Sequence, residues 1–152
     1  MGIVQHLAKG IRDVHFGGNW TSSCFKEQLK GVSWEVAIQS PMGMNSIAAL
    51  VYHTHYYISV VIPVFQGGQL NASDKFSFDC PSIENSEDWD ELLNRVWSDA
   101  EMLASLIELL PENRLWEPFT DEKYGNYYRN IQGIIEHCHY HLGQIVLIKK
   151  MG

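Results

Sequence analysis

The spacing of apolar residues over residues 86–113 is the feature that most restricts how this chain can fold. In SEDWDELLNRVWSDAEMLASLIELLPEN, apolar side chains recur every three or four residues from Trp89 to Leu110. This is the period of a helix with one apolar face, whereas a half-buried strand would alternate every two residues. Ser86 is the expected N-cap, acidic residues follow it, and Pro111 ends the pattern. The segment therefore predicts a long amphipathic helix.

Two further segments are long enough to be helices. Residues 45–68, NSIAALVYHTHYYISVVIPVFQGG, are rich in β-branched and aromatic residues, so a strand is a competing interpretation. Their length without a turn signal favours a helix, capped by Asn45 or Ser46 and kinked near its end by Pro63. Residues 126–150, NYYRNIQGIIEHCHYHLGQIVLIKK, carry a helical apolar stripe in which strand alternation fails.

The N-terminal region predicts a fourth helix in two parts. A short helix runs to about Val14, a junction follows at FGGNW, and helix resumes over SSCFKEQLKG. Between the second and third long helices lies QLNASDKFSFDCPSIEN, a connection rich in Asn, Asp, Ser and Pro. Four helices, one long crossover and no convincing strand predict an all-α fold, a four-helix bundle with the crossover between helices 2 and 3. The length suits a single domain over residues 1–152.

Composition and charge exclude several classes of function. The formal net charge is -7, and the 11 Lys and Arg residues are scattered, which argues against nucleic-acid binding. The longest apolar run, around VVIPVF, is too short to span a bilayer, and no secretory signal is apparent. The 3 cysteines form no CxxC pair, which argues against a disulfide framework. We therefore expect a cytoplasmic protein that binds neither membrane nor nucleic acid.

The histidines of two helical segments are candidate metal ligands. In a helix, His137 and His141 are four residues apart, so their imidazoles lie on adjacent turns and can share one ion. His139 points elsewhere. A third ligand should come from another helix, and VYHTHYY offers His53 and His55, between which helical periodicity does not choose. Histidines on apolar faces are also common hydrogen-bonded core residues, so a metal-free bundle is an alternative.

Four other residues have weaker expectations. Cys138 is expected to be a small buried residue, with a thiolate ligand or redox-active group as the alternative. His15 is expected to be a partly exposed loop residue, with an approach to the mouth of the metal site as the alternative. Glu136 and Gln144 are candidates for orienting a ligand or a substrate, and each is more commonly a polar flank of its helix.

The motif HCHYHLGQI resembles the H-x3-H-x-GQI signature of the DinB-like superfamily, whose members are metal-binding helical bundles. NSIAALVYHTHYY resembles the second-helix segment that supplies a third histidine there, and HFGGNWT and LNASDKFSFDCP are similar to one bacterial branch. The resemblance covers nearly the whole chain. It implies a divalent-metal site of His53, His137 and His141, and it matches His55 and His139 to no ligand position. These two histidines leave an alternative ligand set open.

The resemblance also implies a range of functions. Three neutral imidazoles leave a coordination position for water or substrate, as in catalytic metal sites, and such an ion lowers the pKa of a bound water or thiol. Characterised members of the superfamily include transferases and isomerases that use a low-molecular-weight thiol. The implied protein is a homodimer that binds a divalent metal, Zn or Ni foremost. It would act as a thiol S-transferase, hydrolase or isomerase on an electrophilic substrate. The alternative is a metal-stabilised dimer that binds a partner and catalyses nothing.

Overall fold

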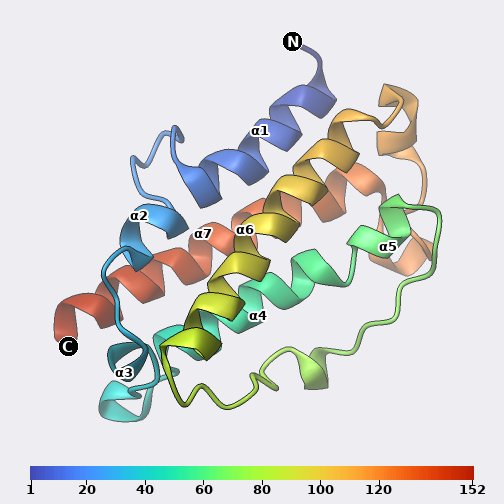
Figure 1. Ribbon diagram of the computed structural model, residues 1–152. Coiled ribbons are helices and arrows are strands. Elements are labelled where there is room, and N and C mark those ends of the chain that lie inside the picture. The colour runs from blue at the N-terminus through green and yellow to red at the C-terminus, as the bar shows by residue number, and fades with distance from the viewer.

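The computed structural model describes all 152 residues, and its regular structure is helical. The four long helices are α1 (Ile3–Phe16), α4 (Ile47–Ser59), α6 (Ser86–Glu108) and α7 (Tyr127–Met151) (Figure 1). The short helices are α2 (Phe25–Leu29), α3 (Trp34–Ala37) and α5 (Ile62–Phe65), and 3-10 turns lie at Pro41–Gly43, Asp74–Phe76, Glu112–Trp116 and Glu122–Tyr124. The only β feature is an isolated bridge between Pro118 and Asn126. The predicted all-α class is confirmed.

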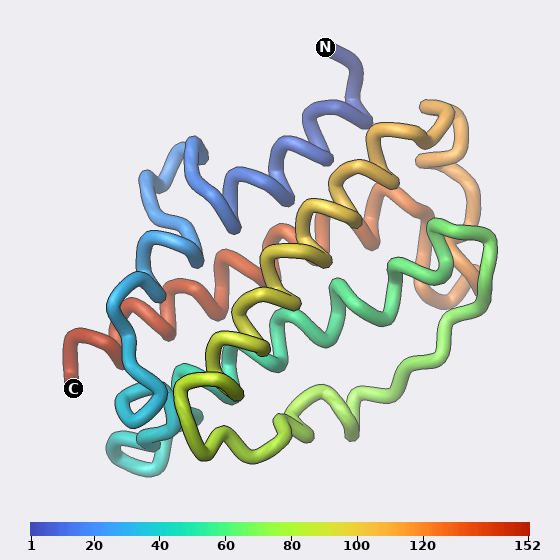
Figure 2. The backbone as a smooth tube through the Cα atoms, in the orientation of Figure 1, coloured from blue at the N-terminus to red at the C-terminus, as the bar shows by residue number.

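The long helices pack in a ring around one apolar core. Helix α1 contacts α6 and α7, and α4 contacts the same two helices from the other side. Each helix contributes fully buried apolar residues to this core, among them Ile11, Val51, Leu103 and Ile131. After α5, residues 66–85 run back along the outside of the molecule to the start of α6 (Figure 2). This connection therefore passes the whole length of α4, the helix that carries His53.

Side-chain caps determine where three of the long helices begin. Ser46 accepts a hydrogen bond from the amide of Ala49, and Asn126 caps α7 in the same way. The cap of α6 differs from the prediction by one residue. Asn85 accepts a hydrogen bond from the amide of Asp88 at 2.9 Å, and Ser86 is already the first helical residue. Asn85 takes this role because its backbone is extended, which directs its side-chain oxygen Oδ1 toward the free amides of the first turn.

The segment with the competing strand interpretation is helical, with one interruption. Helix α4 ends at Ser59 and α5 begins at Ile62, just before Pro63. Proline has no amide hydrogen to donate four residues back, so the helix breaks in the preceding turn. The N-terminal helix continues two residues beyond the predicted end at Val14, and its second part is only the short helix α2.

The stretch Pro41–Phe65 is long and apolar enough to cross a membrane by length and composition. The sequence-based expectation considered only the shorter run around VVIPVF. In the folded chain, 61% of the most apolar part of this stretch is buried, and α4 packs against α6 and α7. The stretch therefore serves as a core helix in this structure.

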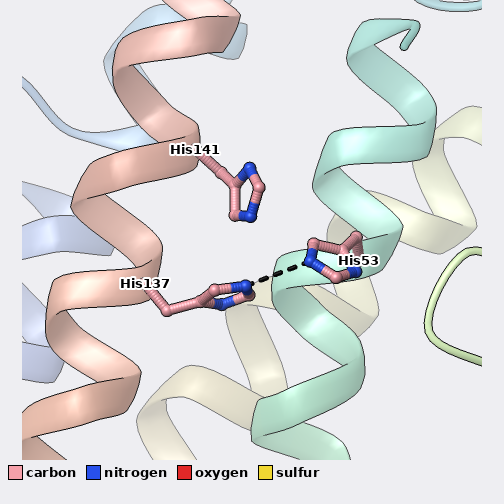
Figure 3. A group of neighbouring side chains, drawn as sticks. All are labelled: His53, His137 and His141. Carbon is pink, nitrogen blue, oxygen red and sulfur yellow. Dashed lines mark hydrogen bonds between the residues drawn. The ribbon is translucent and has the colours of Figure 1, made fainter. Parts of the chain in front are cut away.

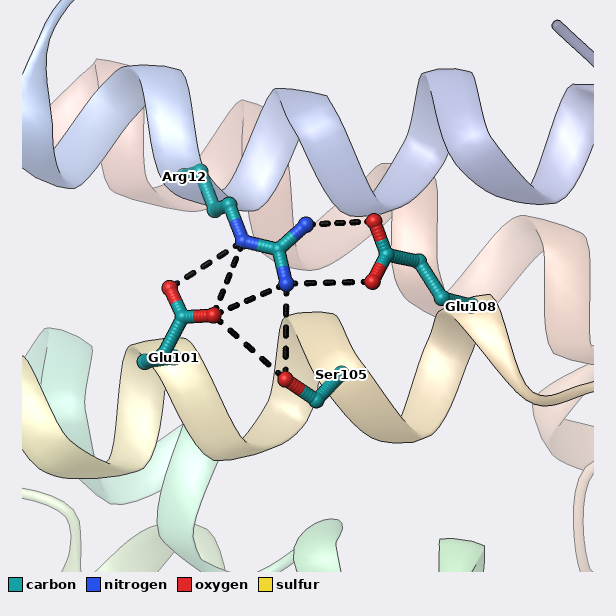
Figure 4. A network of polar contacts seen from close by, with 4 residues as sticks. All are labelled: Arg12, Glu101, Ser105 and Glu108. Carbon is teal, nitrogen blue, oxygen red and sulfur yellow. Dashed lines mark hydrogen bonds and ion pairs between the residues drawn. The ribbon is translucent and has the colours of Figure 1, made fainter.

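A network of polar contacts links α1 to α6 (Figure 4). Arg12 donates to both carboxylate oxygens of Glu101 from Nε and to Oε1 of Glu101 from Nη2, over distances of 2.8–3.1 Å. The same guanidinium also contacts the carboxylate of Glu108 and the hydroxyl of Ser105. Hydrogen bonds from Arg12 lower the pKa of both glutamates.

We expect Arg12→Gln to destabilise the protein at pH 7 and to have little effect at low pH. Loss of the pair with Glu101 should cost about 1 kcal/mol at pH 7, because this pair is partly exposed and screened by solvent. The glutamates have lowered pKa values in the folded state. Their contribution is therefore present above the ordinary value of 4.5 and lost as the pH falls through the folded values. Urea unfolding at pH 7 and pH 3 measures the difference.

The control for this prediction is Arg95→Gln, because Arg95 forms only an exposed pair with Glu91 on the same helix. Such a pair should contribute no more than about 0.5 kcal/mol. An Arg12→Gln loss that is equal at both pH values would show that the network stabilises through packing and not through charge.

Candidate metal centre

Three histidine side chains meet between α4 and α7. His53 comes from the middle of α4, and His137 and His141 come from α7, one helical turn apart (Figure 3). The rings converge because His53 lies on the side of α4 that faces α7, and the two α7 residues share a face of that helix. The three ring centroids lie 4.5–4.8 Å from one another.

The separations of the nitrogens suit a shared ion. The Nε2 atoms of His53 and His137 are 3.1 Å apart, and one ligand nitrogen from each of the three rings lies within 4.8 Å of the others. Two nitrogens that each lie about 2.0–2.1 Å from one ion are at most about 4.2 Å apart. The closest pair already meets this limit, and shifts of less than about 1 Å bring in the third ring.

Hydrogen bonds to protein carbonyl oxygens orient two of the rings. The Nδ1 atom of His53 lies 3.3 Å from the backbone oxygen of Ser77, and Nδ1 of His141 lies 2.6 Å from Oε1 of Gln144. A neutral imidazole that donates from Nδ1 keeps its lone pair on Nε2, as a metal ligand requires. The third ring, His137, has a buried Nδ1 without any hydrogen-bond partner. The donor set and its orientation therefore fit a divalent ion.

Aromatic side chains enclose the three rings. Phe78 stacks on His53 with ring centroids 3.9 Å apart, and Tyr57 presents its ring edge-on to both His53 and His137. Tyr140 packs in the same edge-on way against His141. These contacts restrict ring rotation and keep much of the group away from water, which reduces the cost of ordering the ligands on binding.

Burial favours the neutral forms of His53 and His137. Desolvation, followed by repulsion from the neighbouring imidazoles, lowers the pKa of His137 from 6.5 to about 4. Desolvation and then His141 lower the pKa of His53 in the same way. A neutral imidazole offers a metal ion a free lone pair without the loss of a proton.

A cleft of about 730 Å³ opens beside the group. Its wall includes His137, Tyr57, Glu136 and Arg129. Glu136 is exposed there and accepts a hydrogen bond from Gln132, so it is not part of the ligand group. The group consists of three histidines and no fourth His, Cys, Asp or Glu. The three-histidine group thus differs from a structural metal site, which is closed by four protein ligands. Its rings are close enough together to share an ion.

The structure separates the other candidate residues from this group. His55 lies on another side of α4, where its Nε2 atom is 2.7 Å from Oδ2 of Asp99, and His139 is not within reach of the three rings. Cys138 is completely buried in the apolar core, and burial raises its thiol pKa to about 12, so the thiolate alternative is wrong. The candidate Gln144 does contact a ligand ring, as described above.

Both expectations for His15 were wrong. This residue is 1% exposed, in the last turn of α1, where its Nδ1 atom lies 2.7 Å from the carbonyl oxygen of Ile11. Its ring stacks on Phe25. His15 is adjacent to the FGGNW junction in sequence, but it is a core residue in the fold.

Sequence reasoning did not identify the residues of the crossover that contact the site. Ser77 and Phe78 reach His53 from a segment without helical periodicity. The sequence signal at these positions was a pair of aromatic residues, Phe76 and Phe78, in a polar connection, and this pattern does not indicate what either residue contacts. Tyr57 lines the cleft and presents its ring edge-on to His53 and His137.

Fold and site together define an all-helical protein with a three-histidine group that could hold a metal ion. The sequence pattern of the DinB superfamily matches residues 29–145, which include all three histidines. The chain therefore belongs to the DinB superfamily, as its resemblance predicted. No curated protein and no solved structure matches this chain.

Proposed function

We propose that His53, His137 and His141 bind one divalent metal ion, Zn or Ni, within a DinB-like four-helix bundle. The observation that carries the proposal is the convergence of three imidazoles, two of them oriented through Nδ1. The bundle would be a single domain over residues 1–152, with residues 66–85 as the crossover between its second and third long helices. The mutual contacts of α1, α4, α6 and α7 support this architecture.

We further propose that the protein is a transferase that uses a small thiol. A bound divalent ion would lower the pKa of such a thiol, so that its thiolate attacks an electrophilic carbon and displaces a leaving group at neutral pH. The cleft beside His137 has room for both reactants. Tyr57 is held there by a hydrogen bond from its hydroxyl to Asp74, at 2.8 Å. The guanidinium of Arg129 can receive a negatively charged substrate group at the same wall.

A non-catalytic, metal-stabilised dimer is the second candidate. It is favoured by exposed apolar side chains along α7, where Tyr140 is 67% exposed and Leu147 is 58% exposed. These residues are seven apart and share one helix face, which a second copy of the chain would cover. A homodimer is compatible with either function. We place both candidates in the cytoplasm, and the acidic net charge supports a protein that binds no nucleic acid.

The test measures thiol transfer by protein that carries one equivalent of Zn or Ni. Cysteine and glutathione serve as thiols, and 1-chloro-2,4-dinitrobenzene and monochlorobimane serve as electrophiles. We expect conjugate formation above the uncatalysed rate, lost on chelation and in His137→Ala. If metal binds and conjugation equals the background for every pair, the transferase proposal is rejected and the non-catalytic dimer is favoured. Sedimentation of the same samples determines whether the dimer exists.

Replacing Gln144 by Leu should weaken metal binding by about 10–100-fold, because His141 loses the acceptor that holds its Nδ1 proton. The measurement is a competition titration against a chromophoric chelator. Gln132→Leu is the matched control, since Gln132 lies on the same helix and bonds only Glu136, at 3.4 Å. Equal affinities for the Gln144 variant and the parent would show that this hydrogen bond does not position the ligand.

A further inference from the structure

Only one residue of the crossover is buried, and it contacts a candidate metal ligand. Of residues 66–85, Ser77 alone is buried, and 2% of its surface is exposed. Its carbonyl oxygen lies 3.3 Å from Nδ1 of His53, and the ring of the next residue, Phe78, stacks on the same imidazole. The crossover therefore leaves the surface only where it meets the three-histidine group.

Two tyrosines of α4 hold this part of the crossover, residues 73–78, which we call the strap. The hydroxyl of Tyr56 donates to the carbonyl of Ser73 at 3.0 Å and accepts from the amide of the same residue at 2.9 Å. The hydroxyl of Tyr57 donates to Oδ1 of Asp74 at 2.8 Å. Both tyrosines come from the helix that carries the candidate ligand, so three hydrogen bonds hold the strap against that helix.

The chain on either side of the strap has few contacts of its own. Residues 69–72 and 80–83 form no backbone–backbone hydrogen bonds, and their apolar anchors, Leu70 and Ile83, are only partly buried against the core. Within the strap, backbone hydrogen bonds join only residues three apart. A segment with few buried contacts opens locally at a low cost in free energy. The strap can therefore open while the long helices stay packed.

Opening of the strap would change the environment of His53. The imidazole would lose the acceptor at Ser77 and the stacked ring of Phe78 in one movement, and it could then rotate. A ligand ring that is already held in its binding orientation binds an ion more tightly. If the closed strap raises the affinity for the ion, the bound ion favours the closed strap by the same factor, because such coupling is reciprocal.

We infer that the strap closes on the metal centre, that it fixes the orientation of the His53 ring, and that bound metal in turn keeps it closed. Tyr56 and Tyr57 are positioning residues, which act on the metal through the strap and not as ligands. Because Tyr57 also lines the cleft beside His137, opening of the strap releases one side chain of the cleft wall. This inference rests on the metal site proposed above and adds a segment that responds to its occupancy.

The first test is amide hydrogen exchange at pH 7, followed in ¹H–¹⁵N spectra without metal and with one equivalent of Zn, which is diamagnetic. The hydrogen-bonded amides of the strap are those of Ser73, Phe76 and Ser77. We expect Zn to slow their exchange about tenfold, within the usual range of coupling between two sites. The turn amides of Ser22 and Val32, outside the crossover, are the controls and should not change.

The metal content of the same samples separates two kinds of failure. Stoichiometric Zn with unchanged exchange in the strap overturns the inference and leaves the metal site in place. Zn that does not bind rejects the metal site and the inference together.

The second test is the variant Tyr56→Phe/Tyr57→Phe, which removes the three hydrogen bonds to the strap and keeps both rings and the net charge. It should bind Zn about tenfold more weakly in a competition titration, because an open strap leaves His53 free to rotate. Tyr52→Phe is the matched control, since Tyr52 lies on the same helix and makes no hydrogen bond to the strap, and its affinity should equal that of the parent. An unchanged affinity in the Tyr56→Phe/Tyr57→Phe protein contradicts the inference. If that protein does not fold, the exchange experiment on the parent decides.

Discussion

Alanine at both His137 and His141 should abolish metal binding, from about one divalent ion per chain to less than about 0.1. The variant keeps His53 alone, and a single imidazole does not hold an ion against competition from water and buffer. The measurement is elemental mass spectrometry of protein that was purified without a histidine tag or added metal. Because the changes replace the buried ring of His141 and the partly buried ring of His137, circular dichroism should confirm that the variant remains helical.

The matched control is His139→Ala, which removes a histidine of the same helix that is outside the group. It should retain the full metal content. Metal at equal levels in the parent and in the double variant would place the ion elsewhere in the chain. No metal in the parent, even after Zn and Ni are offered, would show that the three histidines are core residues and reject the proposed metal site.

Removal of the metal should lower the melting temperature by about 10 °C. The three ligands join α4 to α7, and the ion binds only when these helices are packed together. A ligand whose free concentration is a thousand times its dissociation constant stabilises the folded state by about 4 kcal/mol. In a chain of this size each kcal/mol shifts the midpoint by roughly 2–4 °C. The measurement is thermal unfolding by circular dichroism, with and without excess chelator, followed by return of the metal.

The double variant supplies the control for this experiment. Its melting temperature should not respond to chelator or to added metal, because it has lost two of the three ligands. The His139→Ala protein should respond as the parent does. A parent whose melting temperature is the same with and without metal would contradict the inference that the ion links the two helices.

Helical periodicity was sufficient to predict the class of fold and to pair two of the three histidines of the candidate site. The apolar spacing of residues 86–113 and 126–150 predicted α6 and α7, because burial of one helix face requires that period. The same geometry placed His137 and His141 on one face, since residues four apart on a helix are always neighbours. Local rules also narrowed the cap of α4 to Asn45 or Ser46, of which Ser46 is the cap, and located the interruption near Pro63.

Long-range contacts could not be predicted in this way. His53 and His55 are two residues apart, so they point in directions about 200° apart around α4. Periodicity does not determine which of them faces α7. The packing of α4 between α6 and α7 decided this, with His53 toward α7 and His55 against Asp99 of α6. The match of His53 to a ligand position came from the resemblance to the superfamily.

The sequence by itself thus determined what depends on neighbours along one helix: the helices, and the pair of histidines on α7. Only the tertiary structure decided what depends on how helices are rotated and what covers them. It brought His53 to the pair, placed Ser77 and Phe78 of the crossover on the His53 ring, and buried His15. The physical reason is that backbone hydrogen bonds and apolar period act within a segment, whereas helix rotation is set by the packing of the whole core.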